Sequence, residues 1–189
     1  HHINMRLLVM AKLEDKQNSK KVKIGILGGS FDPAHKGHLE ISKQAKKIFG
    51  LQKIIWAITK KNPFKKKSIL SLKTRISFAK KLIASNNFIK IKFYEDRINS
   101  NKTINLINYI KKDKRLKIYF IMGADNLINF HKWHNWKSIS KKCNILVFNR
   151  QGYKAKSLKS ITFKQLNQKK LDFINFKKVN ISSSQLRKI

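Results

Sequence analysis

The 189-residue chain is poor in three features that mark other classes of protein. It has one cysteine, Cys143, which excludes an intrachain disulfide and fits a reducing cytoplasm. Its apolar runs are all far shorter than the roughly 20 residues that span a bilayer. Acidic residues are also scarce, with 9 aspartates and glutamates against 44 lysines and arginines. The first two scarcities predict a cytoplasmic protein without a membrane span, and the third makes the chain strongly basic.

The formal charge of +35 at pH 7 would concentrate any polyanion near the surface, whether a nucleotide, a nucleic acid or an anionic lipid. The basic residues are spread along the whole chain and are not gathered in one block. We therefore favour the solvated cationic surface of a small-molecule enzyme over a dedicated nucleic-acid face. An RNA-binding module stays open as the alternative from another class of protein.

The length suits one full α/β domain. Stretches typical of strands and helices alternate from Lys23 onward, which predicts a parallel sheet with helices on both faces. We assign residues 21–189 to this single domain. Residues 1–20 read as a flexible basic lead-in, and a tag would explain the four residues before Met5.

Apolar runs and turn residues locate the elements of this domain. The strands are expected at residues 23–27, 53–58, 88–93, 144–148 and 171–176, with one more ending at Met122. Helices are expected to end at Gly50 and to begin at Ser71 and Thr103. Trp56 is expected in the core. Residues 154–170 carry little signal and are interpreted as a mobile connection.

The stretch GGSFDPAHKGH, residues 28–38, directly follows the first strand. It matches neither the GxGxxG nor the GxxxxGK fingerprint. A buried strand that ends in paired glycines and opens a helix commonly holds phosphate, because helix-start N–H groups attract anions. The glycines would let a ligand approach closely and can adopt positive φ. If His38 lies in the first helical turn, His35 and His38 can donate hydrogen bonds or, when protonated, charge to one polyphosphate.

A second stretch, GADNLINFHKWHNW, follows the strand that ends at Met122. Asp125 would lie at the carboxyl edge of the sheet, where it can accept both hydroxyls of a ribose, cap the next helix, or do both. Trp133 offers an indole that can stack on an electron-poor pyridine ring, and packing in the core is the alternative. No Cys, Asp or Glu at metal-binding spacing accompanies His131 and His134, so we expect no zinc site and assign no residue to a metal.

The third stretch, ISSSQLR, covers residues 181–187. Serine hydroxyls and helix-start amides can surround phosphate oxygens, and Arg187 adds a permanent forked charge. Taken alone, this string is also compatible with a serine-capped helix.

Together these stretches resemble a known family. Residues 30–39 are similar to the (S/T)FDPxHxGH signature of nucleotidyltransferases that join ATP to a phosphomonoester, and residues 181–187 to their ISSSxLR signature. The second stretch resembles the GADxxxxFxxWxxW run of bacterial nicotinate-mononucleotide adenylyltransferases. The resemblance implies a Rossmann-like, doubly wound parallel sheet. It implies transfer of AMP from ATP to nicotinate mononucleotide in NAD biosynthesis, giving deamido-NAD and pyrophosphate, with Mg²⁺ carried by ATP.

The resemblance also assigns residues to the two substrates. The ATP-binding residues it implies are Gly28, Gly29, Ser30, Phe31, His35, His38, Gly123, Asp125, Arg150, Ser183, Ser184 and Arg187. Of these, His35, His38 and Arg187 would be catalytic, because they would stabilise the leaving pyrophosphate. The mononucleotide-binding residues it implies are Lys65, Thr103, Trp133 and His134.

Some of these assignments compete with other interpretations. Lys65 lies in an NPFK run that resembles the family's NPxK loop, but it could equally belong to a solvated charge run. Thr103 follows a stretch that departs from the family's Ser-Tyr-Thr pattern. Arg75 could be a surface residue or a ligand-binding one. Phosphopantetheine adenylyltransferase is the rival enzyme, since it shares the first motif and the fold but is not expected to carry the second stretch.

Overall fold

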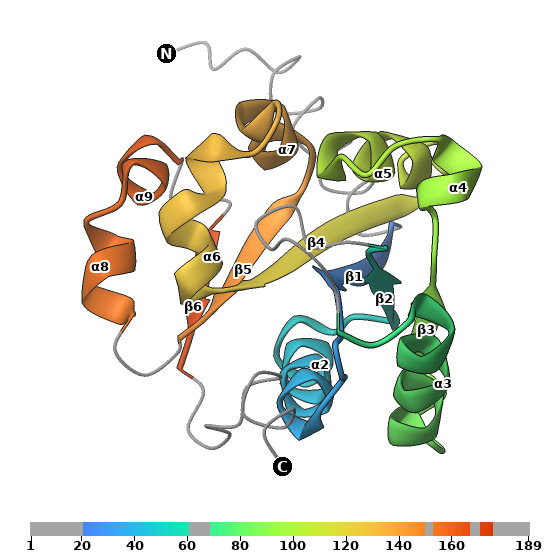
Figure 1. The fold of residues 1–189 in the computed structure, drawn as a ribbon. Coiled ribbons are helices and arrows are strands. Elements are labelled where there is room, and N and C mark those ends of the chain that lie inside the picture. Colours follow the sequence, from blue (N-terminus) through green and yellow to red (C-terminus); the bar gives the residue numbers. More distant parts are fainter. Residues whose placement is uncertain (1–20, 61–68, 150–152, 167–170, 176–189) are drawn as a thin grey trace, which may run out of the picture.

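The computed structural model describes residues 21–60, 69–149, 153–166 and 171–175. They form one six-stranded sheet in the order β3-β2-β1-β4-β5-β6, and every neighbouring pair is parallel (Figure 1). The strands are β1 (Val22–Gly29), β2 (Lys53–Ile58), β3 (Ile89–Lys92), β4 (Leu116–Gly123), β5 (Asn144–Phe148) and β6 (Leu171–Ile174). The six predicted strands are therefore confirmed, with ends shifted by one to two residues at some of them.

Helices connect these strands. They are α2 (Lys36–Phe49), α3 (Leu72–Ile83), α4 (Glu95–Ile98), α5 (Thr103–Ile110), α6 (Ala124–Asn129), α7 (Trp136–Lys142), α8 (Lys154–Leu158), α9 (Ile161–Gln165) and the 3₁₀ helix η1 (Phe130–Lys132). Two of the predicted helix ends are confirmed by their caps. The Ser71 hydroxyl accepts the Thr74 N–H at 3.2 Å, and Gly50 ends α2 in the left-handed conformation, φ 65°.

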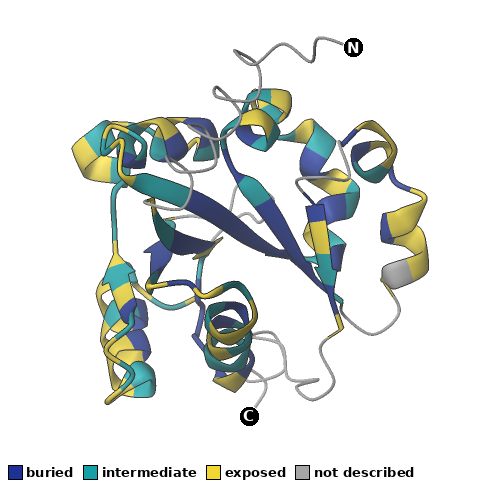
Figure 2. Ribbon diagram, turned by 180° about the vertical axis from the view of Figure 1, so that it is seen from behind, coloured by how far each residue is buried: buried dark blue, intermediate teal, exposed yellow. Residues whose placement is uncertain are grey.

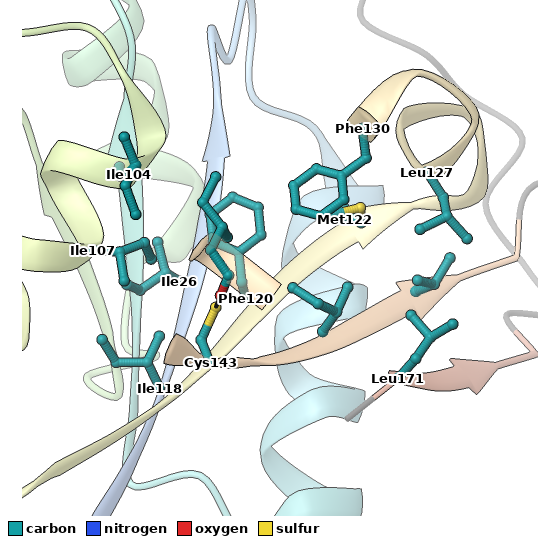
Figure 3. Close-up of a cluster of buried hydrophobic side chains, with 14 of the residues drawn as sticks. Ile26, Ile104, Ile107, Ile118, Phe120, Met122, Leu127, Phe130, Cys143 and Leu171 are labelled. Carbon is teal, nitrogen blue, oxygen red and sulfur yellow. Dashed lines mark hydrogen bonds between the residues drawn. The ribbon is translucent and has the colours of Figure 1, made fainter. Parts of the chain in front are cut away.

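Alternating side chains of the central strands build two separate cores. On one face, Ile24 and Ile26 pack with residues of α5, α6 and α7 (Figure 3). On the other face, Leu27 and Trp56 pack with residues of α2 and α3. The strands are accordingly buried between helices whose outward sides are exposed (Figure 2). This arrangement confirms the doubly wound sheet with helices on both faces and places Trp56 in the core.

The order of the strands creates a switch point between β1 and β4. From β1 the chain runs outward to β2 and β3, and then crosses back to place β4 on the other side of β1. The register pairs Leu27 with Ile121, so the two strands end close to the same level. Helices leave these two ends toward opposite faces of the sheet, and ligands of open α/β sheets bind in the crevice that this leaves. The fold thus brings Gly28, Gly29 and Gly123 to the expected ligand-binding edge.

The interpretation of residues 154–170 as a mobile connection is wrong for the described part, residues 154–166. This part forms α8 and α9, which lie beside α6 (Figure 1). The Ser160 hydroxyl caps α9 by accepting the Phe163 N–H at 3.1 Å, and Ser157 is fully buried. Two helices of five residues each offer too few turns for a clear apolar period, which is why the sequence pattern did not reveal them.

In the part of the chain that the structure describes, no helix combines the length and the apolar character that crossing a membrane requires.

Candidate active site

The β1–α2 turn, residues 28–38, leaves the carboxyl end of β1. Its two glycines can adopt positive φ angles but do not, and among the described glycines only Gly50 has a positive φ. The left-handed residue in the turn is Phe31, φ 48°. Its ring is 2% exposed and stacks on Trp56 with the ring centres 5.0 Å apart. Burial of this ring offsets the cost of the left-handed backbone, which is about 1 to 2 kcal/mol for such a residue.

Two histidines close the start of α2 in a reciprocal cap. His35 is the N-cap residue, and its Nδ1 accepts the Gly37 N–H at 3.0 Å. His38 lies in the first turn, and its Nδ1 accepts the His35 N–H at 3.0 Å. The ring centres are 3.9 Å apart. The condition stated for this pair, that His38 lies in the first turn of the helix, is therefore met, and the two imidazoles lie side by side.

The cap fixes the chemistry of both imidazoles. A ring nitrogen can accept a hydrogen bond only when it carries no proton, so Nδ1 of His35 and of His38 must be unprotonated. The proton of each neutral ring is then on Nε2, which is a hydrogen-bond donor. Protonation of Nδ1 would give charge only by breaking the cap. With this cap in place each imidazole keeps an Nε2–H donor, so the cap favours hydrogen-bond donation among the two roles that the sequence left open.

The N-terminus of α2 adds a further anion-binding feature. The helix has 14 residues and no acidic residue in its first turn. Its positive dipole end and the two Nε2–H groups are therefore part of one short segment, behind the paired glycines of β1. A segment of this kind favours binding of phosphate groups.

A buried arginine lies beneath the turn. Arg75, from the first turn of α3, is 1% exposed. Its guanidinium donates to the carbonyl oxygens of Ser30 and Thr59 at 2.7 Å, of Lys60 at 2.8 Å and of Leu70 at 3.1 Å. Burial lowers the pKa of Arg75, while the nearby carboxylates of Asp32 and Glu95 act in the opposite direction. The arginine therefore connects the turn to the end of β2 and to the start of α3.

Two carboxylates complete this connection. Asp32 is 5% exposed and accepts the N–H groups of Ile69 and Leu70 at 2.8 and 3.0 Å. Both carboxylate oxygens of Glu95, at the start of α4, lie 3.2 Å from the Lys60 nitrogen and accept its N–H. Burial raises the pKa of the Glu95 carboxyl, and the Lys60 N–H opposes the change. The Lys60 peptide is thus bound on both sides, by Glu95 at its N–H and by Arg75 at its carbonyl.

The α6–η1 segment, residues 123–134, leaves the carboxyl end of β4. Asp125 lies half-buried in the first turn of α6, directly after Gly123. Trp133 is also half-buried, and it makes edge-on contacts with the rings of Phe120 and Phe130 at centroid distances of 6.0 and 5.0 Å. The accessible part of the indole is available to a ligand, so core packing and ligand stacking are compatible here.

Phe120 links the two segments. Its ring, 3% exposed and drawn in Figure 3, contacts Trp133 on one side. A Cβ built on Gly28 would lie 3.8 Å from its Cζ atom. One buried ring of β4 therefore lies against both the glycine end of β1 and the indole.

The α6–η1 segment is supported from outside by α9. The hydroxyl of Thr162, which is fully buried, accepts the His131 N–H at 3.1 Å. This bond ties η1 to the helix pair α8 and α9. The two helices that the sequence did not reveal thus hold the backbone two residues from Trp133.

The other predicted site residues lie partly within and partly outside the described residues. Ser30 is half-buried in the turn, Thr103 is the half-buried first residue of α5, and His134 is exposed after η1. Five predicted residues lie outside the described residues: Lys65, Arg150, Ser183, Ser184 and Arg187.

Three residues with clear positional roles were not predicted: Asp32, Arg75 and Glu95. A signal existed for Arg75, because residues 72, 76, 79 and 83 form the apolar face of α3 and position 75 lies on that face. A charged residue on an apolar face is expected to have buried partners. Its carbonyl partners lie on other segments, which the sequence pattern does not identify.

A doubly wound sheet whose central strands end in glycines beside a capped helix start defines a Rossmann-like nucleotide-binding protein. Comparison with known proteins gives the family. A family model described as cytidylyltransferase-like matches residues 26–189. A "probable nicotinate-nucleotide adenylyltransferase" of Pelagibacter ubique is 73% identical over 95% of this chain and 100% of its own length. One of Agrobacterium fabrum is 34% identical over 79% of this chain and 80% of its own length.

A solved structure agrees in fold. The nicotinic acid mononucleotide adenylyltransferase of Plasmodium falciparum, complexed with NaAD, superposes with a TM-score of 0.74. It is 22% identical and the match covers 88% of this chain and 83% of that one, a likeness that shows the fold. The chain therefore belongs to the cytidylyltransferase-like family and, within it, to the nicotinate-nucleotide adenylyltransferases.

Proposed function

We propose that this chain transfers the adenylyl group of ATP to nicotinate mononucleotide in NAD biosynthesis, releasing pyrophosphate and giving deamido-NAD. The observation that carries the proposal is the pair of neutral histidines that cap α2 beside the glycine end of β1. This pair offers two fixed N–H donors to a polyphosphate at the switch point of the sheet. Family membership supports nicotinate mononucleotide as the second substrate.

The reaction needs no protein nucleophile. A phosphate oxygen of the mononucleotide attacks the α-phosphorus of ATP, and the bond from that phosphorus to the bridging oxygen of the β-phosphate breaks. Charge develops on the leaving pyrophosphate. The Nε2–H groups of His35 and His38 and the positive dipole end of α2 would stabilise it, which is catalysis by positioning and electrostatics. Arg187, Ser183 and Ser184 would add donors from the end of the chain.

The other half of the crevice would bind the sugars and the pyridine ring. In this proposal Gly123 lets ATP approach β4, Asp125 accepts ribose hydroxyls, and Arg150 braces the adenosine. On the mononucleotide side, we propose that Trp133 stacks on the nicotinate ring. Lys65, Thr103 and His134 complete that set.

Mg²⁺ enters this proposal as part of the substrate, MgATP. Among the described residues, no three side chains of His, Cys, Asp or Glu come together as a metal site. In the β1–α2 turn, Asp32 uses its carboxylate to bind two backbone N–H groups. The donor set of the turn thus suits a cation held by ATP phosphates and water, which is how Mg²⁺ is usually bound.

We further propose that residues 21–189 act as one domain in the cytoplasm. The single sheet that runs from β1 to β6 and the family match from residue 26 to 189 support one domain. The one cysteine, Cys143, is buried and its thiol donates to the Ile139 carbonyl at 3.1 Å, and a single cysteine that forms no intrachain disulfide fits a reducing compartment.

Pyrophosphate release from MgATP tests the proposal, with nicotinate mononucleotide, nicotinamide mononucleotide and phosphopantetheine supplied separately. Fast release with nicotinate mononucleotide alone is the expected result. Release with phosphopantetheine alone would instead assign the chain to the rival reaction. Inactivity with all three acceptors would overturn the proposal and direct attention to RNA, whose binding would weaken steeply with added salt.

A further inference from the structure

Arg75 joins three segments that meet only through the fold. Its guanidinium donates to Ser30 in the β1–α2 turn, to Thr59 and Lys60 at the end of β2, and to Leu70 before α3. The Ser30 carbonyl is separated from the capping residue His35 by only four residues. Every shift of the guanidinium would therefore be transmitted to the segment that carries both imidazoles.

Burying the guanidinium of Arg75 lowers the stability of the fold unless its contacts do more than fill space. A buried charge loses its hydration, and an apolar side chain of similar volume often stabilises a fold as well or better. Four carbonyl oxygens from three segments need several donors in a fixed plane, which the guanidinium fork provides and an ammonium does not. The contacts of Arg75 thus suit a residue that sets the relative position of backbone segments.

We propose that Arg75 is a positioning residue for adenylyl transfer, which holds the β1–α2 turn at its working distance from the end of β2. It touches backbone carbonyls and acts through the turn. This inference rests on the proposed function for the identity of the ligand, ATP. The expected consequence is that Arg75 controls both ATP binding and the rate of transfer.

Glu95 provides an internal comparison. It binds the N–H of Lys60, the residue whose carbonyl Arg75 binds, and no described contact connects it to the turn. A variant of Glu95 should therefore disturb the end of β2 and leave the turn in place. A variant of Arg75 should disturb both.

The experiment compares three variants of the full chain: Arg75→Lys, Glu95→Ala and, as a matched control, Lys80→Met on the exposed side of the same helix α3. Titration calorimetry measures the affinity for a non-hydrolysable ATP analogue, and pyrophosphate release measures kcat and KM. Arg75→Lys should weaken ATP binding roughly tenfold and lower kcat by about 10²-fold, a loss typical of reacting groups misplaced by a fraction of an ångström to an ångström. Lys80→Met should leave the ATP affinity within about twofold, and Glu95→Ala should weaken ATP binding less than Arg75→Lys does.

Rescue separates positioning from mere stability. Arg75→Ala should regain part of its kcat when ethylguanidinium is added, and ethylammonium at the same concentration should not restore it. A structural role alone predicts a lower melting temperature with normal ATP affinity and normal kcat in the folded Arg75→Lys protein. That result would overturn the inference and leave the proposed function intact.

The two proposals can fail separately. If the wild-type chain binds the ATP analogue but releases no pyrophosphate with nicotinate mononucleotide, the proposed function is wrong. The effect of Arg75→Lys on ATP affinity then still decides the inference. A wild-type chain that binds no ATP would overturn both.

Discussion

The two segments that leave the central strands are built by different means. The β1–α2 turn is buried from Phe31 to His35 and is hydrogen-bonded internally, with its histidines capping a helix of 14 residues. The α6–η1 segment begins at Gly123, which has no side chain to cap its helix, and α6 has six residues. Its indole is held by edge-on ring contacts, with a half-buried surface. Polar bonds dominate in the β1–α2 turn. In the α6–η1 segment ring packing dominates, supplemented by the hydrogen bond from the His131 N–H to the Thr162 hydroxyl.

Each half combines stability with function in its own way. In the turn, one nitrogen of each imidazole maintains the helix start while the other is the donor proposed for phosphate. Changes there should affect stability and catalysis together unless a variant separates the two nitrogens. In the α6–η1 segment, one part of the Trp133 indole packs in the core and another part is exposed. A substitution of Trp133 should therefore change the binding of nicotinate mononucleotide and leave the phosphate-binding turn intact.

The largest effect is expected at His38. His38→Ala removes both nitrogens, so it should lower kcat/KM about 10²- to 10³-fold, as the loss of one electrostatic donor does. It should also lower the free energy of unfolding by about 1 kcal/mol, the usual cost of a lost helix cap. Steady-state kinetics and urea unfolding measure the two effects.

His38→Asn separates them. Its side-chain oxygen can replace Nδ1 as acceptor for the His35 N–H, while its amide N–H₂ is shorter than the imidazole and does not reach the position of the Nε2–H donor. This variant should lose as much activity as His38→Ala and keep most of the stability. Full activity in His38→Asn would show that the Nε2–H of His38 has no role in the reaction.

The next largest effect is expected at Trp133. Trp133→Ala should raise the KM for nicotinate mononucleotide about two- to tenfold, because stacking contributes roughly 0.5 to 1.5 kcal/mol. The KM for ATP should stay close to that of the wild type. Trp136→Ala is the matched control, since this indole also packs edge-on against Phe130, at 5.9 Å. Equal losses in both variants would mean that Trp133 acts through the core and not on the ring of the substrate.

A smaller effect is expected at Thr162, which supports the α6–η1 segment from α9. Thr162→Val leaves the His131 N–H without its acceptor and should cost about 1 to 3 kcal/mol of stability. The KM for the mononucleotide should rise modestly while that for ATP stays unchanged. Thr162→Ser keeps the hydroxyl and should behave like the wild type in thermal unfolding and kinetics. A rise in the KM for ATP alone would contradict the separation of the two halves.

The smallest effect concerns Glu95. Its pKa is raised in the folded protein by burial, above the ordinary value of 4.5. The folded protein therefore binds a proton that the unfolded chain releases in the window between these two values, so Glu95 favours stability more as the pH falls through that window. Relative to Glu95→Gln, the wild type should gain a little in melting temperature on acidification. A relative loss would show that the Lys60 N–H outweighs burial.

The strands and the histidine pair could be predicted from the sequence because both depend on local patterns. The strands were predictable because long apolar runs mark buried parallel strands, as in residues 53–58. The histidine pair was predictable because its spacing places both rings in one helical turn. The positive φ of Phe31 was not, because it depends on the contact of its ring with Trp56, 25 residues away in the chain.

The supports of the site were the hardest to predict. Arg75 lies on the apolar face of α3, but only the folded chain brings the carbonyls of Ser30 and Thr59 to its guanidinium. In the same way, α9 has too few residues for a visible period, and its role depends on the bond from His131 to Thr162. Local sequence patterns identify the side chains proposed to contact the ligand. The residues that support them, such as Arg75 and Thr162, are defined by hydrogen bonds between segments far apart in the sequence.

The most direct test of this account is the separate titration of a non-hydrolysable ATP analogue and of nicotinate mononucleotide into the His38→Asn and Trp133→Ala variants. We expect a crossed result: His38→Asn weakens binding of the ATP analogue and leaves the affinity for the mononucleotide unchanged, and Trp133→Ala does the reverse. If either variant weakened only the other ligand, or both variants weakened both ligands equally, the assignment of phosphate to the β1–α2 turn and of the pyridine ring to the α6–η1 segment would be contradicted.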